Sequence, residues 1–341
     1  MSVDPTPELI HRPTRAASYR PGAIVGERYR LDRLLGSGGM GTVWAALQLG
    51  TDRPVALKIL RADHRSTVAA RLRFQREARV LGRIDHPNLV AVRELFEDGE
   101  PPTQVPVLVM DLLEGQSLAE RLANRGRLPL GEVARLLPDA LRAIHTAHAA
   151  GVVHRDLKPD NLFVVQAASG SESLRVLDFG IAKLIDDDDP TAIAITGKGE
   201  VLGTPPYMAP EQLRGESEID RRVDVWALGV ILYEILSGRR PFTGDRFVQF
   251  HQRVTSGKRD PMAVAAPDLP RDVTLLVEKM LSVERERRCP DLTEAIEVLE
   301  RHCRGQAMPE SPRRWPRALW VAGLVAIIGL TAVLLLQLLA R

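Results

Sequence analysis

The sequence predicts an α+β protein in which a small β-rich lobe precedes a larger α-helical lobe. Two observations lead to this prediction. Residues 29–109 carry short β-branched and apolar runs separated by glycines, as strands and turns do. After residue 115, apolar side chains recur mainly at helical spacing. The 341 residues, 45% of them hydrophobic, are enough to bury the cores of two such lobes.

The chain begins with a Pro- and Arg-containing leader, residues 1–28, which we expect to be mobile. The β-rich lobe is predicted to follow over residues 29–110. Its expected strands include residues 29–35, 42–49, 55–60 and 105–110, and a helix is expected at 66–83.

The helical lobe is predicted over residues 115–303. A hairpin tip is expected at 169–173 and a long polar loop at 186–199. The expected helices are at 118–123, 130–150, 223–237, 247–256, 273–281 and 293–303.

Composition excludes several classes of protein. A formal net charge of +2 argues against a nucleic-acid binder held by bulk electrostatics. Cys289 and Cys303 are too few for a disulfide framework, and their spacing matches no zinc pattern. The polar leader has no apolar stretch that could serve as a secretory signal. We therefore expect the bulk of the chain to stay in a reducing compartment.

The C-terminal tail predicts a membrane anchor. Residues 304–317 form a basic, Pro-containing linker, and residues 318–340 contain no charged side chain. At ~1.5 Å per residue the uncharged stretch spans roughly 34 Å, enough for a ~30 Å hydrocarbon core. We predict one transmembrane helix at 318–340.

Orientation follows from the charges beside this helix. Arg313, Arg314 and Arg317 precede it, so the positive-inside rule predicts a single-pass protein of the cell membrane with its bulk in the cytoplasm. Only Arg341 follows, so we expect no sensor domain on the far side. A small-xxx-small pair, Ala322 and Ala326, is compatible with a homodimer without favouring one.

A glycine-rich motif, G-x-G-x-x-G-x-V, occupies residues 36–43. A dinucleotide-binding fingerprint has the same glycine spacing, but it requires a helix that opens at the third glycine. Here Gly41 leads into Thr42-Val43-Trp44, which is typical of a strand. The motif therefore favours a strand–loop–strand hairpin over phosphates, with a plain glycine-rich turn as the alternative.

Lys58 ends the apolar run Val55-Ala56-Leu57-Lys58. An unpaired ammonium group would be costly in such a strand, so Lys58 needs an anionic partner. The alternative is a lysine on an edge strand that reaches solvent.

Two further motifs carry the resemblance to a family. His154-Arg155-Asp156-Leu157-Lys158-Pro159-Asp160-Asn161 matches H-R-D-x-x-x-x-N at every fixed position, and Asp178-Phe179-Gly180 follows a predicted strand. With the glycine loop and Lys58 in the same order, the chain resembles the bacterial-type (Hanks-type) serine/threonine protein kinases over about residues 29–303. The resemblance implies a bilobal protein kinase fold, to which the predicted C-terminal transmembrane helix is added.

The resemblance implies roles for the residues of these motifs. Asp156 would accept or orient the proton of a substrate hydroxyl, and Lys158, typical of serine/threonine kinases, would contact the transferred phosphate. Asn161 and Asp178 would hold Mg²⁺ or Mn²⁺. Lys58 would bind the α- and β-phosphates of ATP and pair with a glutamate, for which Glu77 is the candidate.

The resemblance also implies a nucleotide site and protein substrates that carry Ser or Thr. Asp111 stands where a glutamate is more usual, and a backbone contact to adenine should persist there. The expected nucleotide-binding residues are Leu35, Gly36, Ser37, Gly38, Gly39, Met40, Gly41, Val43, Ala56, Lys58, Asp111 and Leu113.

Residues 209–211, Ala-Pro-Glu, extend the resemblance into the helical lobe. Arg288 would pair with Glu211, Asp224 would brace the catalytic loop, and Thr204 would support Asp156 and Lys158. These are expectations from the family pattern.

Regulation is expected in the segment that ends at Glu211. An Arg directly before the catalytic Asp, here Arg155, commonly binds a phosphate on this segment. We predict autophosphorylation at Thr196 first and Thr191 second.

Two alternatives from other classes remain. A catalytically inactive pseudokinase scaffold would lack an essential Lys, Asp or Asn, and none is missing. A Rossmann-type oxidoreductase would leave residues 154–161 and 178–180 unexplained. The sequence does not identify the substrate proteins or the activating signal.

Overall fold

The computed structural model describes residues 19–38, 41–60, 80, 82, 84–100, 104–166, 170–179, 205–244 and 246–303. The polar loop predicted at 186–199, the tail from residue 304 and all but two residues of the helix predicted at 66–83 lie outside these residues. Among the helices that the structure describes, none is both long and apolar enough to cross a membrane.

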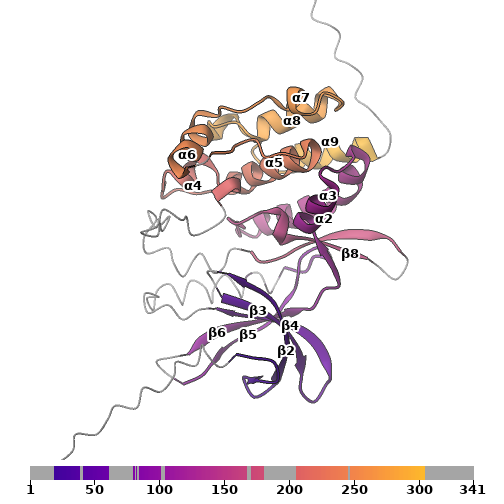
Figure 1. The fold of residues 1–341 in the computed structure, drawn as a ribbon, viewed down its shortest axis with the longest axis vertical. Helices are drawn as coiled ribbons and strands as arrows, with labels where there is room; N and C mark the ends of the chain where they lie inside the picture. Colours follow the sequence, from indigo (N-terminus) through magenta and orange to yellow (C-terminus); the bar gives the residue numbers. More distant parts are fainter. Residues whose placement is uncertain are drawn as a thin grey trace, which may run out of the picture. The chain divides into compact units, whose positions relative to one another are not determined.

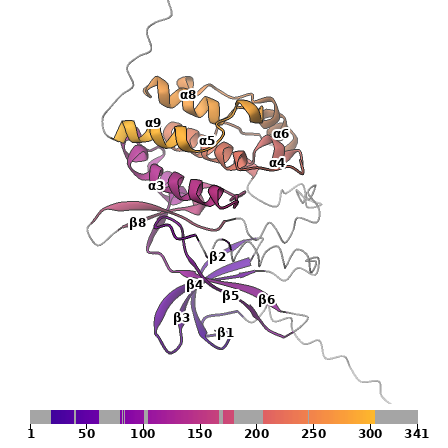
Figure 2. The same cartoon turned by 180° about the vertical axis from the view of Figure 1, so that it is seen from behind.

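An antiparallel sheet of six strands forms the N-terminal lobe, in the order β1-β2-β3-β4-β6-β5 (Figures 1 and 2). One face of the sheet buries an apolar cluster that includes Tyr29, Leu31, Trp44, Leu57 and Val107. The strands are β1 (Ile24–Val25), β2 (Tyr29–Gly38), β3 (Gly41–Gln48), β4 (Arg53–Leu60), β5 (Val92–Asp98) and β6 (Val105–Asp111).

Residues 19–28, which the sequence assigns to the mobile leader, belong to this lobe. Strand β1 pairs with β2. The carboxylate of Asp98 accepts hydrogen bonds from the Tyr19 hydroxyl at 2.9 Å and from the Gly26 backbone N–H at 3.0 Å. The folded lobe therefore begins before Tyr29, because these contacts come from a residue more than seventy positions away.

The C-terminal lobe packs its helices around α5 (Arg222–Ser237). Every residue from 223 to 236 in this helix is buried, as expected for a helix that is apolar on all sides. A Cβ on Gly229 would lie 2.9 Å from the Cβ of Met280, so glycine lets α8 approach closely. The other helices are α2 (Leu118–Arg125), α3 (Leu130–Ala149), α4 (Pro210–Leu213), α6 (Phe247–Ser256), α7 (Met262–Ala265), α8 (Arg271–Met280) and α9 (Thr293–Cys303), with 3₁₀ turns η2 (Pro159–Asn161), η4 (Pro205–Tyr207) and η5 (Arg285–Arg287).

A second, three-stranded sheet lies in this lobe beside α3 and contains β7 (Gly115–Ser117), β8 (Leu162–Gln166) and β9 (Glu172–Val176). Strands β8 and β9 form an antiparallel hairpin, which confirms the hairpin predicted near residue 170. Asn161 directly precedes β8 and Asp178 follows β9 by two residues. The hairpin thus carries both predicted metal-binding residues at one end.

Candidate active site

Lys58 lies in the interior of the N-terminal sheet. Its strand β4 pairs with β3 on one side and with β6 on the other, so the alternative of an edge-strand lysine is wrong. The side chain is 13% exposed, and its Nζ lies 3.0 Å from Oδ1 of Asp178. The anionic partner that the apolar strand demands is therefore the Asp of the D-F-G motif.

The glycine-rich motif forms the hairpin between β2 and β3, with Gly38 opposite Gly41. No helix opens at Gly41, so a dinucleotide-binding fingerprint is excluded. Gly41 has φ 147°, and a Cβ there would lie 2.1 Å from the carbonyl oxygen of Ile59. A Cβ on Gly36 or Gly38 would meet no described atom within 4 Å, so packing among the described residues does not require glycine there.

Asp224 is fully buried in α5 and holds the backbone of the catalytic loop, residues 154–161. Its carboxylate accepts hydrogen bonds from the backbone N–H of His154 at 2.7 Å and of Arg155 at 2.8 Å. Arg155 has φ 63°, a conformation that a non-glycine residue rarely adopts without support. The bracing that the family pattern implied for Asp224 is thus seen in its contacts.

Asp156, Lys158 and Asn161 come together on this braced loop. Nζ of Lys158 lies 3.3 Å from Oδ2 of Asp156. The side-chain amide of Asn161 donates to the carbonyl of Asp156 at 2.7 Å. The three side chains are therefore fixed against one another by the loop itself.

His154 connects the loop to the strand end that carries Asp178. Its Nε2 lies 2.9 Å from the carbonyl oxygen of Leu177 and therefore donates, while Nδ1 accepts from the backbone N–H of Asp156 at 3.3 Å. The ring also packs against Phe179, with centroids 4.7 Å apart. Complete burial lowers the pKa of His154, which agrees with a neutral imidazole in this position.

The Ala-Pro-Glu segment is anchored by an ion pair with almost no exposure. Two nitrogens of the Arg288 guanidinium donate to the two carboxylate oxygens of Glu211 at 2.7 and 3.1 Å. Arg288 also donates to the backbone carbonyls of Arg222 and Ser282. This pairing confirms the expectation for Glu211 and Arg288.

Comparison with known proteins agrees with this geometry. The family model described as the protein kinase domain matches residues 29–300. The chain belongs to the protein kinase family. It is 41% identical over 249 residues to the serine/threonine-protein kinase pkn3 of Myxococcus xanthus. The matched residues make up 72% of this chain and 44% of pkn3.

Other kinases show the same relationship. The serine/threonine-protein kinase PknB of Mycobacterium tuberculosis is 36% identical over 85% of this chain and 45% of its own length. The crystal structure of the M. tuberculosis PknI kinase domain superimposes with a TM-score of 0.63 at 24% identity, over 83% of this chain and 99% of that domain. This likeness supports the bilobal fold. The chain spans about half or less of the length of pkn3 and PknB.

Several predicted residues of the kinase site lie outside the described structure. These are Gly39, Met40, Glu77, Gly180, Thr191, Thr196 and Thr204. Of the predicted nucleotide-binding residues that are described, Ala56 is buried in β4 opposite Met110, and Val43 and Leu113 are half-buried. Leu35 is 40% exposed at the glycine-rich hairpin.

The sequence missed two residues that contact the kinase catalytic loop or its brace. Nε2 of His148 in α3 lies 2.7 Å from the carboxylate of Asp224. The side-chain amide of Gln212 donates to the carbonyl of Arg155 at 3.1 Å. The position of His148 among buried residues of α3 is a signal that could have drawn attention to it. Nothing in the sequence singles out Gln212.

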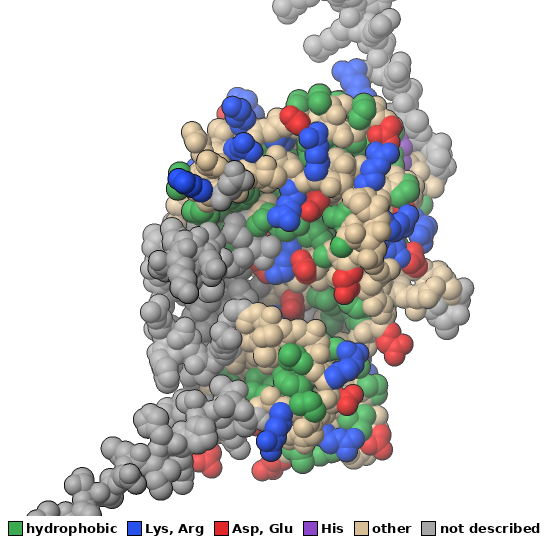
Figure 3. Space-filling model, in the orientation of Figure 1, with side chains coloured by type: hydrophobic (Ala, Val, Ile, Leu, Met, Phe, Trp, Pro, Cys, Tyr) green, Lys and Arg blue, Asp and Glu red, His purple; other side chains and the backbone are tan. Residues whose placement is uncertain are grey.

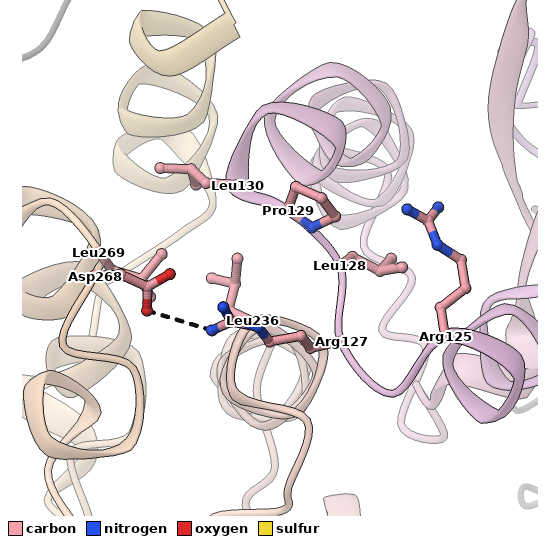
Figure 4. Close-up of a pocket in the computed structure, with 8 residues that line it drawn as sticks. All are labelled: Arg125, Arg127, Leu128, Pro129, Leu130, Leu236, Asp268 and Leu269. Carbon is pink, nitrogen blue, oxygen red and sulfur yellow. Dashed lines mark hydrogen bonds and ion pairs between the residues drawn. The ribbon is translucent and has the colours of Figure 1, made fainter.

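A cleft of about 360 Å³ lies apart from the predicted kinase site (Figure 4). It contains Leu128 and Leu236 beside an exposed ion pair between Arg127 and Asp268, whose atoms are 3.3 Å apart. Of the predicted site residues that the structure describes, none lines this cleft. On the face drawn in Figure 3, basic and acidic side chains of the described residues are interspersed.

Proposed function

We propose that this kinase transfers the γ-phosphate of ATP to serine and threonine hydroxyls of proteins. The observation that carries the proposal is the assembly of Lys58 with Asp178 and of Asp156 with Lys158 at 3.0 and 3.3 Å. Two of these groups, Asp156 and Lys158, stand on the braced loop, while Asp178 follows β9 and Lys58 stands on β4. The names of the related proteins support the serine/threonine class.

Asp156 is the proposed group that receives or orients the proton of the substrate hydroxyl. A carboxylate accepts such a proton only when it is held within hydrogen-bond reach, and the brace on residues 154 and 155 supplies the required rigidity. Lys158 beside it would neutralise charge that develops on the transferred phosphoryl group.

The residues present fit a divalent cation and a nucleotide. Asn161 commits its amide nitrogen to the carbonyl of Asp156, so its oxygen lies on the opposite side of the amide group. An amide oxygen and the Asp178 carboxylate are ligands suited to Mg²⁺, which would neutralise phosphate charge when bound. Gly36 and Gly38 leave open the space that a Cβ would fill, as a phosphate close to the backbone requires.

The test is phosphate transfer from radiolabelled ATP with Mg²⁺ to a mixed Ser/Thr protein substrate. We expect Asp156→Asn to lose at least 10²-fold in rate, because it removes the proton acceptor. Asp139→Asn, on the exposed side of α3, is the matched control and should retain the wild-type rate. Equal rates for Asp156→Asn and wild type would contradict the assignment of Asp156. Wild-type protein that binds ATP without transferring phosphate would favour the inactive scaffold.

We also propose that the kinase phosphorylates itself at Thr196 and, secondarily, at Thr191. The support is Arg155, which directly precedes Asp156 and is of the type that pairs with a phosphorylated activation segment. Mass spectrometry of purified protein incubated with ATP should find phosphate between residues 186 and 201. Protein that is active but carries no phosphate there would contradict this proposal.

We further propose that residues 318–340 cross the cell membrane once and leave the kinase domain in the cytoplasm. The support is their 23-residue length without a charge and the arginines that precede them. The full chain should remain in the membrane fraction after carbonate extraction, and a deletion of 313–341 should be released while still transferring phosphate. Release of the full chain would contradict the anchor. The lipid bilayer is thus a proposed partner, and homodimer formation is not assumed.

A further inference from the structure

The carboxylate of Asp111 joins three neighbouring strands, β4, β6 and β5, at one end of the N-terminal sheet. Asp111 is the last residue of β6, and its backbone stands opposite Val55 of β4. The chain then continues through 112–114 to β7 in the C-terminal lobe. Asp111 is therefore the last residue of the N-terminal sheet before the chain passes to the C-terminal lobe.

Two arginines from the adjacent strands bind this carboxylate. Nε and Nη2 of Arg93, in β5, donate to Oδ1 and Oδ2 of Asp111 at 2.7 and 2.9 Å. Arg53, the first residue of β4, donates to Oδ1 at 3.4 Å. The contact with Arg93 has the two parallel bonds of a guanidinium–carboxylate pair, which fixes orientation as well as distance.

The backbone of β5 is built to direct Arg93 toward Asp111. The register of β5 and β6 changes from Val92 opposite Met110 to Glu94 opposite Val109, so Arg93 is the extra residue of a β-bulge. A bulge changes the direction of a side chain relative to a regular strand. In a regular pairing Arg93 would stand opposite a residue of β6, and its side chain would not be turned toward the end of β6, where Asp111 lies.

The short side chain of Asp111 fits this arrangement. The sequence marked Asp111 as a departure from the more usual glutamate, without a reason for it. The carboxylate of an aspartate lies one methylene closer to its own backbone, so a bidentate bond to it also restrains the backbone of residue 111. The contact is a restraint on the main chain at the end of β6.

We propose that Arg93 is a positioning residue for the nucleotide, which acts by holding the backbone of Asp111 in place to receive the adenine ring. This inference rests on the proposed ATP-dependent activity and on the backbone contact to adenine that we expect at residue 111. Adenine offers an amine donor and ring-nitrogen acceptors, so it pairs with main-chain carbonyl and N–H groups at fixed positions. In this proposal Arg93 acts through Asp111 alone.

The N-terminal lobe contains a control contact of similar exposure. Arg28 makes an equally bidentate contact with Glu94, at 3.2 and 2.7 Å. The exposed fractions of these side chains, 50% and 33%, are close to the 43% and 34% of Arg93 and Asp111. Arg28→Ala therefore removes a comparably exposed bidentate contact from the same lobe, together with the packing of the Arg28 guanidinium over Tyr29 and Phe96, without touching the end of β6.

The experiment measures the Kd of Mg·ATP by calorimetry, together with KM for ATP and kcat, on the full chain. We expect Arg93→Ala to raise Kd and KM about three- to fivefold with kcat within about twofold, the size typical of an exposed ion pair. Arg93→Lys keeps the charge but loses the planar fork, so it should behave as Arg93→Ala does. Arg28→Ala should match wild type.

Two results would overturn the inference. One is a wild-type Kd for Arg93→Ala, and the other is an equal rise for Arg28→Ala, which would indicate general weakening of the lobe. Melting temperatures of all variants identify the second case. Wild-type protein that binds Mg·ATP without transferring phosphate would contradict the proposed function, while the comparison of Kd values would still decide the role of Arg93.

Discussion

The C-terminal lobe buries its most important charged contact, whereas the N-terminal lobe keeps two comparable contacts at the surface. The side chains of Arg288 and Glu211 are 0% and 3% exposed. Those of the pairs Arg28–Glu94 and Arg93–Asp111 are between 33% and 50% exposed. All three pairs have bidentate geometry, so burial is the main difference between them.

This difference in burial predicts that the ion pairs of the two lobes contribute differently to stability. A buried charge that loses its partner is costly, so the C-terminal lobe can hold the Ala-Pro-Glu segment in one arrangement. Exposed pairs contribute little to stability and can be rearranged at small cost. This agrees with a rigid catalytic lobe and with the modest effect, about three- to fivefold, that we expect when Arg93 is removed from the N-terminal sheet.

The largest expected effect comes from breaking the buried pair. Arg288→Met should destabilise the protein by about 3–5 kcal/mol, because Glu211 would keep its charge in a buried site without a partner. Chemical denaturation followed by tryptophan fluorescence measures the change. Adding Glu211→Gln removes the orphaned charge and should recover part of the loss. A loss of stability below about 1 kcal/mol for Arg288→Met would contradict the view that burial makes this pair more important to stability than the exposed pairs of the N-terminal lobe.

Asp224→Asn should have the next largest effect. One amide oxygen cannot replace a carboxylate that accepts from His154, Arg155 and His148, so at least one buried donor is orphaned, at a cost of about 1–3 kcal/mol. The catalytic loop should also shift, and a rate loss on the order of 10² is expected. The measurement is kcat with stability determined in parallel. Unchanged kcat would show that the brace does not position Asp156.

Two glycines of the glycine-rich hairpin show whether the N-terminal lobe also contains positions that tolerate no change. Gly41 is crowded by the backbone of Ile59, whereas Gly36 faces open space. Gly41→Ala should cost about 1–3 kcal/mol, because its Cβ would collide with the backbone of Ile59 at a φ that alanine rarely adopts. Gly36→Ala should leave stability unchanged and raise KM for ATP, since its Cβ would enter open space. Thermal unfolding and KM together separate the two positions. Equal loss of stability would contradict the proposed space for phosphate.

The smallest effect is expected for the surface pair of the N-terminal lobe. Arg28→Ala should cost no more than about 1 kcal/mol, because water replaces much of the lost contact. Raising the salt concentration should reduce the difference from wild type. The test is a denaturation series at two ionic strengths. A loss as large as that of Arg288→Met would mean that exposure does not distinguish the lobes.

Much of the fold and the kinase site could be predicted from local pattern. The strand runs, the helices of the C-terminal lobe and the glycine-rich hairpin are set by the spacing of apolar and glycine residues, and the structure confirms them. Lys58 could be identified because an ammonium group within an apolar strand needs a partner, although the partner seen at 3.0 Å is Asp178. Glu77, the glutamate that the family pattern suggested, lies outside the described residues.

Other features had no local signal. Residues 19–28 fold onto the lobe through Asp98, and the bulge at Arg93 exists only in the register of β5 against β6. His148 contacts Asp224 across 76 positions of the chain. A hydrogen bond of this kind depends on how elements pack, which no short window of sequence specifies.

The sequence by itself determined the residue types that the predicted chemistry needs and the elements that carry them, because both depend on neighbours along the chain. Only the tertiary structure decided which charged contacts are buried and which are exposed. It also decided that Asp111 binds Arg93 through a bulge. Burial and register are properties of packed elements, and the physical cost of breaking each ion pair follows from them.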